Sequence, residues 1–482
     1  MKTAILLLCA LACAAPAGAL NINSAVKEMA ARPGIQNASW GISVKDAATG
    51  RVILERDAQK NLLPASILKI FVTAAAFDLL GADYRIRTGV YYDGAISNGS
   101  LNGNIYLKGA GDPSLGSQFI KDARSADDTF KLWADAIKAK GINAINGAVV
   151  GDESLFESVQ PGSWAWEDIG NYYAAPASAL TINDNLYKLY FKPGENPGDK
   201  AEALRTEPLL PELTFKNHVL TGPGGSGDNT YVYAFPGLHE AVLRGTVPRG
   251  PAEFAVKGAL PDPALFAARS FSAFLARAGI IADREPYRTS SEPAGKPELV
   301  TETEGSPLAD IVRVTNKRSF NLYAELLLRQ LAVSRGLKGT AAAGIQVLKD
   351  FLAAQGADTS ELRLADASGL SRVNMTKAVN FTDLLCSVSK KKYFEAFRDT
   401  LVFPADPEAT GHIRRLGRDG LLAAGLRIKS GSLAGVRAYT GYLRTQKGRT
   451  LAFTFIMNNY SAAPAGIDKL HEDLLLKLAE HY

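Results

Sequence analysis

Alternating apolar and polar positions near the start of the chain predict a β-hairpin that leads into a buried helix. Residues 39–45 and 51–55 both alternate, and residues 48–50 form a turn signal between them. The next apolar stretch, residues 70–80, is hydrophobic nearly all round, which indicates a helix inside a core. The pattern thus places a rigid helix shortly after a pair of strands.

Short strands dominate the middle of the chain. Residues 84–92 and 101–107 predict strands separated by Asp-Gly and Asn-Gly turn signals. Residues 186–256 alternate strand patterns with glycine and proline clusters, which predicts a small all-β unit. We interpret residues 286–307 as a connection back to another unit. Helices are predicted within this part over residues 130–140 and 262–278.

The last third mixes helices with strands. Helices are predicted over residues 322–331, 340–355 and 377–388, and strands over 425–429, 435–444 and 450–457. Residues 467–478 form an amphipathic helix. We interpret it as packed on the sheet rather than as the alternative, a membrane-surface anchor, since its polar face mixes both charges.

The first 19 residues carry one positive charge, Lys2, then a short apolar run and a small-residue ending, which predicts a cleaved secretory signal. The signal contains Cys9 and Cys13, so Cys386 remains alone and no intramolecular disulfide is possible. Removing Lys2 lowers the net charge from +5 to +4, too small and too dispersed to indicate nucleic-acid binding. No later apolar stretch is long enough to span a bilayer. We expect a soluble exported protein rather than a lipoprotein.

Ser66 and Lys69 are the first candidates for chemistry. In a helix they lie on one face, where the amine reaches the hydroxyl. A lysine that acts as a base near neutral pH needs its pKa lowered by about three units, or about 4 kcal/mol. Burial and a nearby second cation both lower it. The same Ser-x-x-Lys spacing occurs three more times in the chain, so only its position before a buried helix singles this pair out.

Two further motifs follow in order. Residues 319–321, Ser-Phe-Asn, begin 253 residues after Ser66 and precede a predicted helix. Residues 429–431, Lys-Ser-Gly, end a predicted strand, and Lys-Ser/Thr-Gly occurs nowhere else in the chain. The five histidines are far apart, so nothing supports a Ser-His-Asp triad, and no cluster has zinc-site spacing.

In this order, the three motifs form the signature of active-site-serine penicillin-recognising enzymes. The chain resembles the class C low-molecular-mass penicillin-binding proteins, the D-alanyl-D-alanine carboxypeptidase/endopeptidase family. The resemblance covers nearly the whole mature chain and includes residues 111–115, 164–185, 321–325 and 366–372. Two departures are mild: Phe320 stands where Asp is common, and Ser430 replaces a frequent Thr but keeps the hydroxyl.

The resemblance implies an α+β multidomain protein located in the periplasm after loss of the signal peptide, residues 1–19. A penicillin-binding/serine β-lactamase-like domain, with a five-stranded antiparallel sheet flanked by helices, would comprise residues 20–82 and 296–482. Residues 83–185 and 257–295 would form an inserted domain, and 186–256 a nested β-rich domain. Peptidoglycan stem peptides and cross-links are the implied substrates and β-lactams the inhibitors. Neither a cofactor nor a metal is expected.

The resemblance also implies a role for each motif residue. Ser66 attacks a D-Ala-D-Ala or related peptide carbonyl, and Lys69 takes its proton. Ser319 relays a proton to the leaving amine, and Asn321 holds Lys69 and the substrate amide. Lys429, kept cationic, fixes Ser319 and attracts the terminal carboxylate.

The remaining implied contacts are with substrate. Ser430 bonds to the carboxylate, and Gly431 and Ser432 complete this edge of the site. Backbone N–H groups of Ser66 and Ser432 would form an oxyanion hole. The aromatic and acidic residues Trp166, Glu167 and Asp168 are candidate substrate contacts, and the two acids could receive the free amino group of a stem peptide.

Several alternatives stay open. Asn321 could merely cap the helix from residue 322, and Trp166 to Asp168 could pack locally. A β-lactamase uses the same first steps, but the glutamate-to-asparagine spacing of its class A form is missing here. A catalytically silent wall-binding protein is the contrasting hypothesis, although binding alone does not need all five motif residues.

Overall fold

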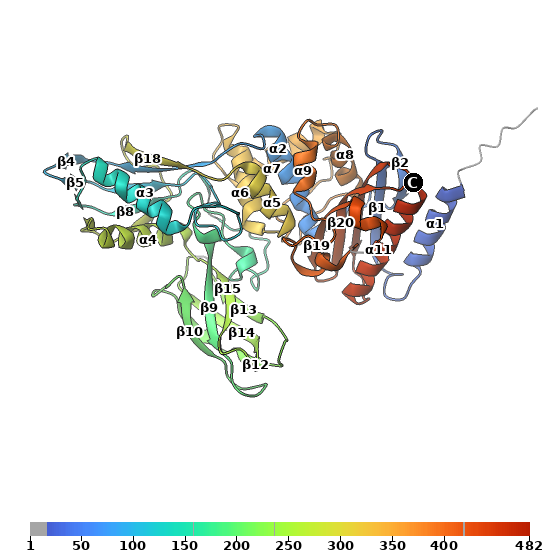
Figure 1. The fold of residues 1–482 in the computed structure, drawn as a ribbon, viewed down its shortest axis with the longest axis horizontal. Coiled ribbons are helices and arrows are strands. Elements are labelled where there is room, and N and C mark those ends of the chain that lie inside the picture. Colours follow the sequence, from blue (N-terminus) through green and yellow to red (C-terminus); the bar gives the residue numbers. More distant parts are fainter. Residues whose placement is uncertain (1–16, 158, 236, 418–419) are drawn as a thin grey trace, which may run out of the picture.

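The computed structural model describes residues 17–482 except 158, 236, 418 and 419 (Figure 1). Its C-terminal half and its first strands share one antiparallel sheet of order β19-β20-β21-β1-β2. These strands are β1 (Ser39–Asp46), β2 (Val52–Arg56), β19 (Leu426–Leu433), β20 (Val436–Arg444) and β21 (Thr450–Asn458). The predicted hairpin and the five-stranded antiparallel sheet are confirmed.

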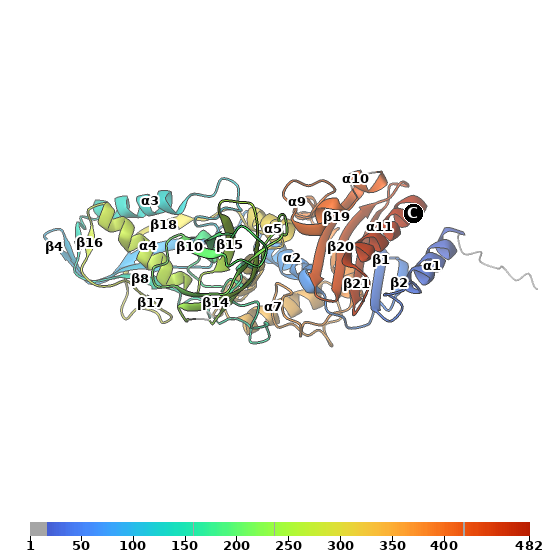
Figure 2. The same ribbon diagram turned by 90° about the horizontal axis from the view of Figure 1, so that it is seen from below.

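Helices cover both faces of this sheet (Figures 1 and 2). One face carries α1 (Ala17–Ala30), α10 (Leu421–Gly425) and α11 (Pro464–His481). The core on the other side contains α2 (Lys69–Leu79), α5 (Leu308–Lys317), α6 (Asn321–Val333), α7 (Ala341–Ala354), α8 (Ala378–Val388) and α9 (Phe394–Asp399). Strand β21 shows why two cores form, because its side chains alternate between faces. Phe453 and Phe455 join the core with α11, whereas Ala452 and Ile456 join the core with α2.

Helix α11 settles the interpretation of the C-terminal amphipathic pattern. Its apolar residues Ile467, Leu470, Leu474 and Leu478 are fully buried in the core beneath the sheet. Packing on the sheet is confirmed, and the membrane-surface anchor is wrong because the protein already covers those residues. Among the described helices, none combines the length and apolar character needed to cross a bilayer. Residues 1–16 of the predicted signal peptide lie outside the described residues.

The inserted part has two sheets with two helices. Strand order is β17-β8-β6-β3-β18 in one sheet and β16-β7-β5-β4 in the other. The elements are β3 (Arg87–Tyr92), β4 (Ala95–Ser97), β5 (Ser100–Asn102), β6 (Ile105–Lys108), α3 (Ala126–Ala139), β7 (Ala144–Ile145), β8 (Val149–Asp152), α4 (Pro263–Arg277), β16 (Ile281–Ala282), β17 (Tyr287–Thr289) and β18 (Glu298–Glu304).

Strands β17 and β18 correct the interpretation of residues 286–307 as a connection. Strand β17 pairs with β8, and β18 pairs with β3 over residues 298–304. The inserted sheet thus extends to residue 304, beyond the boundary predicted at 295. The division into domains otherwise stays a prediction.

A β-rich unit projects from the inserted part, as the all-β pattern of residues 186–256 predicted (Figure 1). It contains β9 (Leu186–Lys192), β10 (Glu202–Glu207), β11 (Thr214–Asn217), β12 (Leu220–Gly222), β13 (Asn229–Ala234), β14 (Glu240–Pro248) and β15 (Phe254–Ala259). Strand β9 joins β10 and β15 in one sheet, and β14 joins β11, β12 and β13 in another.

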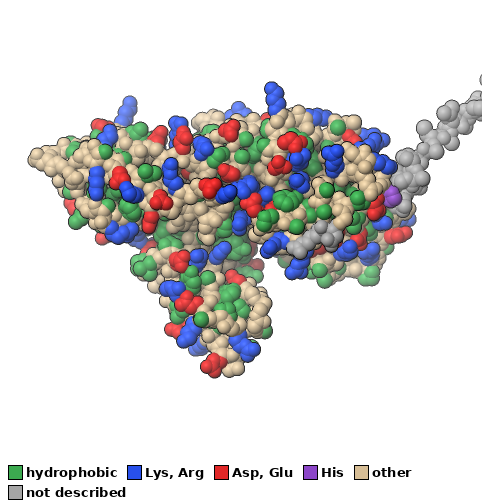
Figure 3. Space-filling model, viewed as in Figure 1, with side chains coloured by type: hydrophobic (Ala, Val, Ile, Leu, Met, Phe, Trp, Pro, Cys, Tyr) green, Lys and Arg blue, Asp and Glu red, His purple; other side chains and the backbone are tan. Residues whose placement is uncertain are grey.

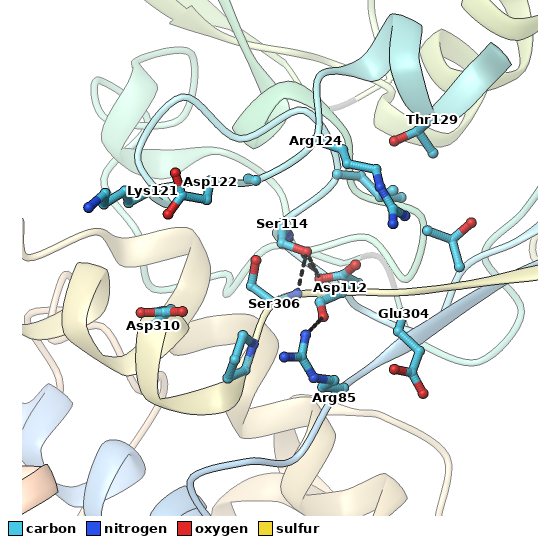
Figure 4. A pocket seen from close by; sticks show the side chains of 15 residues that line it. Arg85, Asp112, Ser114, Lys121, Asp122, Arg124, Thr129, Glu304, Ser306 and Asp310 are labelled. Carbon is cyan, nitrogen blue, oxygen red and sulfur yellow. Dashed lines mark hydrogen bonds between the residues drawn. The ribbon is translucent and has the colours of Figure 1, made fainter. Parts of the chain in front are cut away.

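A hydrogen-bonded junction ties the inserted part to α5, beside a cavity of about 370 Å³ (Figure 4). Ser114 Oγ donates to Asp112 Oδ1 over 2.7 Å and accepts from the N–H of Ser306 over 3.0 Å. Arg85 donates to the carbonyl of Gly305 over 2.7 Å. The residues that line the cavity include none of the three motifs, and the bonds link the inserted part to the segment between β18 and α5.

Candidate active site

Ser66 lies on a short 3₁₀ turn, η1 (Ala65–Leu68), that continues directly into α2. Every residue of α2 from Lys69 to Phe77 is buried, as the all-round apolar pattern predicted. Lys69 itself is fully buried, and its Nζ lies 3.0 Å from Ser66 Oγ. The structure therefore places the two residues of the first motif in direct contact on a rigid support.

The Lys69 amine has two further polar neighbours, and both are acceptors. It donates to Asn321 Oδ1 over 2.6 Å and to the carbonyl of Ser368 over 2.5 Å. Burial lowers the pKa of Lys69 to about 7, although the charges of Asp366 and Glu325 act in the opposite direction. Burial is thus the cause of the shift that a lysine base requires.

Asn321 opens α6 but does not cap it. Phe320 occupies the N-cap position, and no side-chain cap bond is present. The Asn321 amide instead uses both ends: its oxygen faces Lys69, and its Nδ2 donates to the carbonyl of Tyr173 over 2.7 Å. The capping alternative is wrong. Ser319, with a φ of 57°, turns the chain immediately before this helix.

Lys429 connects the second and third motifs. It is 1% exposed on β19, and its Nζ donates to Ser319 Oγ over 2.9 Å and to the carbonyl of Ser430 over 2.7 Å. Burial and the charge on Lys69 hold the pKa of Lys429 well below its ordinary value. Two buried ammonium groups this near would repel each other, so the ammonium form of Lys429 is less stable here than in water, while the cationic Lys429 that the resemblance implies stays a prediction.

Gly431 permits the close approach of β19 to the nucleophile. A Cβ at this position would lie 2.7 Å from the carbonyl oxygen of Pro64 and 3.0 Å from the backbone N of Ser66. Any larger residue would push the strand away, which explains glycine at this point of the motif. The backbones of Ser66 and of the strand that carries Ser432 are thus neighbours, while the oxyanion hole itself stays a prediction.

A loop that the motifs did not assign positions the carbonyl of Ser368 on Lys69. Glu325 Oε1 accepts from the N–H groups of Ala367 and Ser368 over 3.0 and 2.8 Å. Asp366 Oδ2 accepts from Trp164 Nε1 over 2.8 Å. Both carboxylates are almost fully buried. The resemblance of residues 321–325 and 366–372 to the family was the only sign in the sequence that these residues matter. The sequence does not reveal that the two segments are in contact.

Arg437 of β20 is a second residue that sequence reasoning missed. Its guanidinium holds both oxygens of Asp468, on α11, over 2.7 and 3.0 Å. It also donates to Ser432 Oγ over 2.7 Å. The buried Arg437 thus holds in place the exposed Ser432, which directly follows the third motif. No local sequence pattern indicates these contacts of Arg437, because its partners lie on separate elements.

The three candidate contacts around Trp166 differ in their surroundings. Asp168 is half-buried, accepts from the Tyr173 hydroxyl over 3.0 Å, and has its pKa raised by burial. Glu167 is exposed. Trp166 is 66% exposed and packs on Tyr233, with ring centroids 4.7 Å apart. Only Asp168 lies next to a residue that contacts Asn321; substrate binding by all three stays a prediction.

In the part of the chain that the structure describes, no three histidine, cysteine or acidic side chains are grouped so that they could hold a metal ion.

Comparisons with known proteins identify the family and the fold of the chain. The sequence profile of the D-Ala-D-Ala carboxypeptidase 3 (S13) family matches residues 22–474. A D-alanyl-D-alanine carboxypeptidase from an Actinomadura species is 28% identical over 461 residues, covering 93% of this chain and 82% of the relative. The crystal structure of penicillin-binding protein 4 from Haemophilus influenzae superposes with a TM-score of 0.79 at 23% identity, covering 95% of this chain and 99% of that one. Its complex with a β-lactam gives a TM-score of 0.76 at 21% identity and the same coverage.

Proposed function

The chain belongs to the D-Ala-D-Ala carboxypeptidase 3 (S13) family, as the resemblance predicted, and we propose that it is a serine DD-peptidase acting on peptidoglycan stem peptides through an acyl-enzyme. One observation carries this proposal. The hydroxyl of Ser66 contacts a fully buried lysine amine whose other two polar neighbours are hydrogen-bond acceptors.

The hydrogen bonds of Lys69 determine what its amine can do. A neutral amine has two N–H donors and one lone pair, whereas the ammonium has three donors. The acceptors on Asn321 and Ser368 take the two N–H groups of the neutral form. The lone pair is left for the hydroxyl proton of Ser66, which is the geometry of general-base catalysis.

The reaction follows from these positions. Ser66 Oγ forms a bond to the D-Ala carbonyl carbon while its proton moves to Lys69. The leaving amine takes a proton from Ser319, whose hydroxyl regains one through Lys69 or Lys429, its hydrogen-bonded neighbour at 2.9 Å. Water then attacks the acyl carbon as its proton passes to Lys69, the ester bond to Ser66 Oγ breaks, that oxygen takes the proton back from Lys69, and the shortened peptide leaves with a new carboxyl group.

The terminal carboxylate of the substrate accounts for the third motif. An anion beside Lys429 favours the ammonium form, because an opposite charge raises a lysine pKa. Substrate binding would thus restore the cation that burial disfavours in the empty site. Ser430 and Ser432 supply hydroxyls on the same strand, and Asp168 is the candidate for a free stem-peptide amine.

Three finer assignments belong to the same proposal. Cleavage of cross-links, that is endopeptidase activity, uses the same chemistry on a different leaving amine. Periplasmic location rests on the predicted signal peptide. Acylation by β-lactams is supported by the β-lactam complex of the similar Haemophilus influenzae protein, and we expect it to be long-lived, unlike turnover by a β-lactamase.

Intact-protein mass spectrometry after mixing with benzylpenicillin tests the proposal. The native chain should gain the mass of one penicilloyl group, and a Ser66→Ala variant should not. Hydrolysis of a D-Ala-D-Ala pentapeptide then measures peptidase activity. Rapid antibiotic turnover would instead indicate a β-lactamase, and absence of both adduct and turnover would favour a silent wall-binding protein.

A further inference from the structure

Aromatic rings gather on the exposed side of the β-rich unit. Trp166 is 66% exposed, Phe235 65% and Tyr231 43%. Tyr233 lies between its neighbours, with its ring centroid 4.7 Å from that of Trp166 and 6.2 Å from that of Tyr231. Hydrophobic side chains are visible on this unit in Figure 3. We name these four residues the aromatic surface.

The arrangement follows from strand periodicity. On β13, Tyr231 and Tyr233 point to the same side, whereas Val232 between them is 1% exposed in the core. A strand that needed only a buried face would carry polar residues at the outward positions. Exposed aromatic clusters of this kind are typical of ligand or partner sites.

Polar groups border the rings. A cavity of about 530 Å³ is lined by Trp166, Tyr233 and Phe235 and by the charged residues Glu240 and Arg244. Aromatic faces beside hydrogen-bonding groups suit a ligand with flat apolar faces and polar edges, which describes a pyranose sugar. Glu240 is paired with Lys216 over 2.7 Å, so the border supplies hydrogen-bonding groups without the group of unpaired basic side chains on which binding to an anionic membrane surface relies.

The segment of residues 164–173 joins this surface to the residues of the proposed active site. At its start, Trp164 donates to Asp366, and at its end the Tyr173 carbonyl accepts from Asn321. Between these points, Trp166 packs on Tyr233 of β13. The chain beside the nucleophile therefore continues without a break to the aromatic surface.

We propose that the aromatic surface binds the sugar chain of peptidoglycan, a β-1,4-linked chain of N-acetylated sugars, while its stem peptide occupies the Ser66 site. This inference rests on the proposed function, because stem peptides in the wall are attached to that chain. Two linked contacts raise the effective concentration of the peptide at the nucleophile. The enzyme should thus favour peptides carried on glycan over free peptides.

Tryptophan fluorescence tests sugar binding without any peptidase assay. Of the four tryptophans, Trp40, Trp133 and Trp164 are at most 6% exposed, so Trp166 is the one that a ligand can reach. Titration with a soluble β-1,4-linked N-acetylglucosamine tetramer should give a saturable change whose midpoint moves at least tenfold higher in Tyr233→Ala, which keeps the Trp166 reporter, and no change in the native chain would overturn the proposal. Tyr287→Ala removes an exposed tyrosine from the inserted part and should titrate like the native chain.

A substrate comparison tests the functional consequence. The ratio of kcat/KM for glycan-attached peptide to that for free pentapeptide should fall at least tenfold in Tyr233→Ala and stay constant in Tyr287→Ala. An equal loss on both substrates would overturn the proposal, as would an unchanged ratio. Trp166-dependent sedimentation with phosphatidylglycerol vesicles, or Trp166-dependent dimerisation, without a sugar response would assign the surface to another occupant.

The two proposals fail separately. Absence of a benzylpenicillin adduct on the native chain would refute the serine peptidase but leave the sugar titration interpretable. A normal adduct without a fluorescence response would refute sugar binding alone.

Discussion

Acylation of Ser66 should depend on the protonation of Lys69, and lowering the pH is the cleanest perturbation. The pKa of Lys69 is lowered to about 7 by burial. Only the neutral amine can take the serine proton, so the acylation rate should rise with pH and level off above the pKa. The direction follows from a lysine whose charged form is disfavoured by its surroundings.

The magnitude follows from the titration curve. With a pKa of about 7, roughly nine-tenths of Lys69 is neutral at pH 8 and about one-hundredth at pH 5. The rate constant for acylation by benzylpenicillin should thus drop about 90-fold between these values, close to tenfold for each unit below pH 6. Mass spectrometry of samples quenched at set times measures this rate constant, and near-UV circular dichroism at pH 5 checks that the protein stays folded.

Two variants make the test specific to Lys69. Lys69→Arg keeps a permanent cation and should show no acylation at any pH. Glu325→Gln keeps an oxygen that accepts from the backbone of Ala367 and Ser368 but removes a charge that raises the Lys69 pKa, so the midpoint should move to lower pH. A rate that is flat from pH 5 to pH 8, or that falls with rising pH, would refute the lysine base.

Three further predictions concern other parts of the fold. Gly431→Ala should slow acylation at least tenfold because its Cβ would displace β19. The control Gly466→Ala has open space around it in α11, so it should acylate normally and raise the stability by about 0.5–1 kcal/mol in thermal unfolding. Lys429→Met removes the amine that bonds to Ser319 Oγ over 2.9 Å and that a terminal carboxylate would face, so kcat/KM for a D-Ala-D-Ala pentapeptide should fall at least tenfold, and an unchanged kcat/KM would contradict this role. Burial lowers the pKa of His471 to about 3, so between pH 6.5 and pH 3 the unfolded chain binds more protons than the folded one, and stability decreases as the pH is lowered. His471→Gln should therefore lose about 3 kcal/mol less stability between pH 7 and pH 4 in denaturant titrations. An equal loss in both proteins would contradict this prediction.

Local patterns were sufficient where an element is decided by its own residues. Strand β1 alternates because Ile42 and Val44 pack in the core with α11, whereas Ser43 faces α8 and bonds to Thr382. Helix α2 is apolar all round because it is buried. The three motifs were recognisable because each occupies a few adjacent positions. Such features need no knowledge of distant partners.

Strand β18 was missed because its sequence carries almost no burial signal. It lies at the edge of its sheet, and of its seven residues only Thr303 is buried. Its partner β3 lies about two hundred residues earlier, so pairing could not be inferred from neighbouring positions. The acceptor on Lys69 was missed for a related reason. The carbonyl of Ser368 is a backbone group, and every residue has one.

The inserted part contacts the residues of the proposed mechanism through Asn321. An amide has an acceptor end and a donor end, and the Tyr173 carbonyl can receive only the donor end. This bond leaves the Asn321 oxygen for Lys69, whose N–H it accepts. If the amide were reversed, its NH₂ group would face the Lys69 amine, and the lysine lone pair would be drawn to that donor instead of the Ser66 hydroxyl. In the proposed mechanism, the carbonyl of Tyr173, a residue outside the three motifs, would thus set the direction of proton transfer between Ser66 and Lys69.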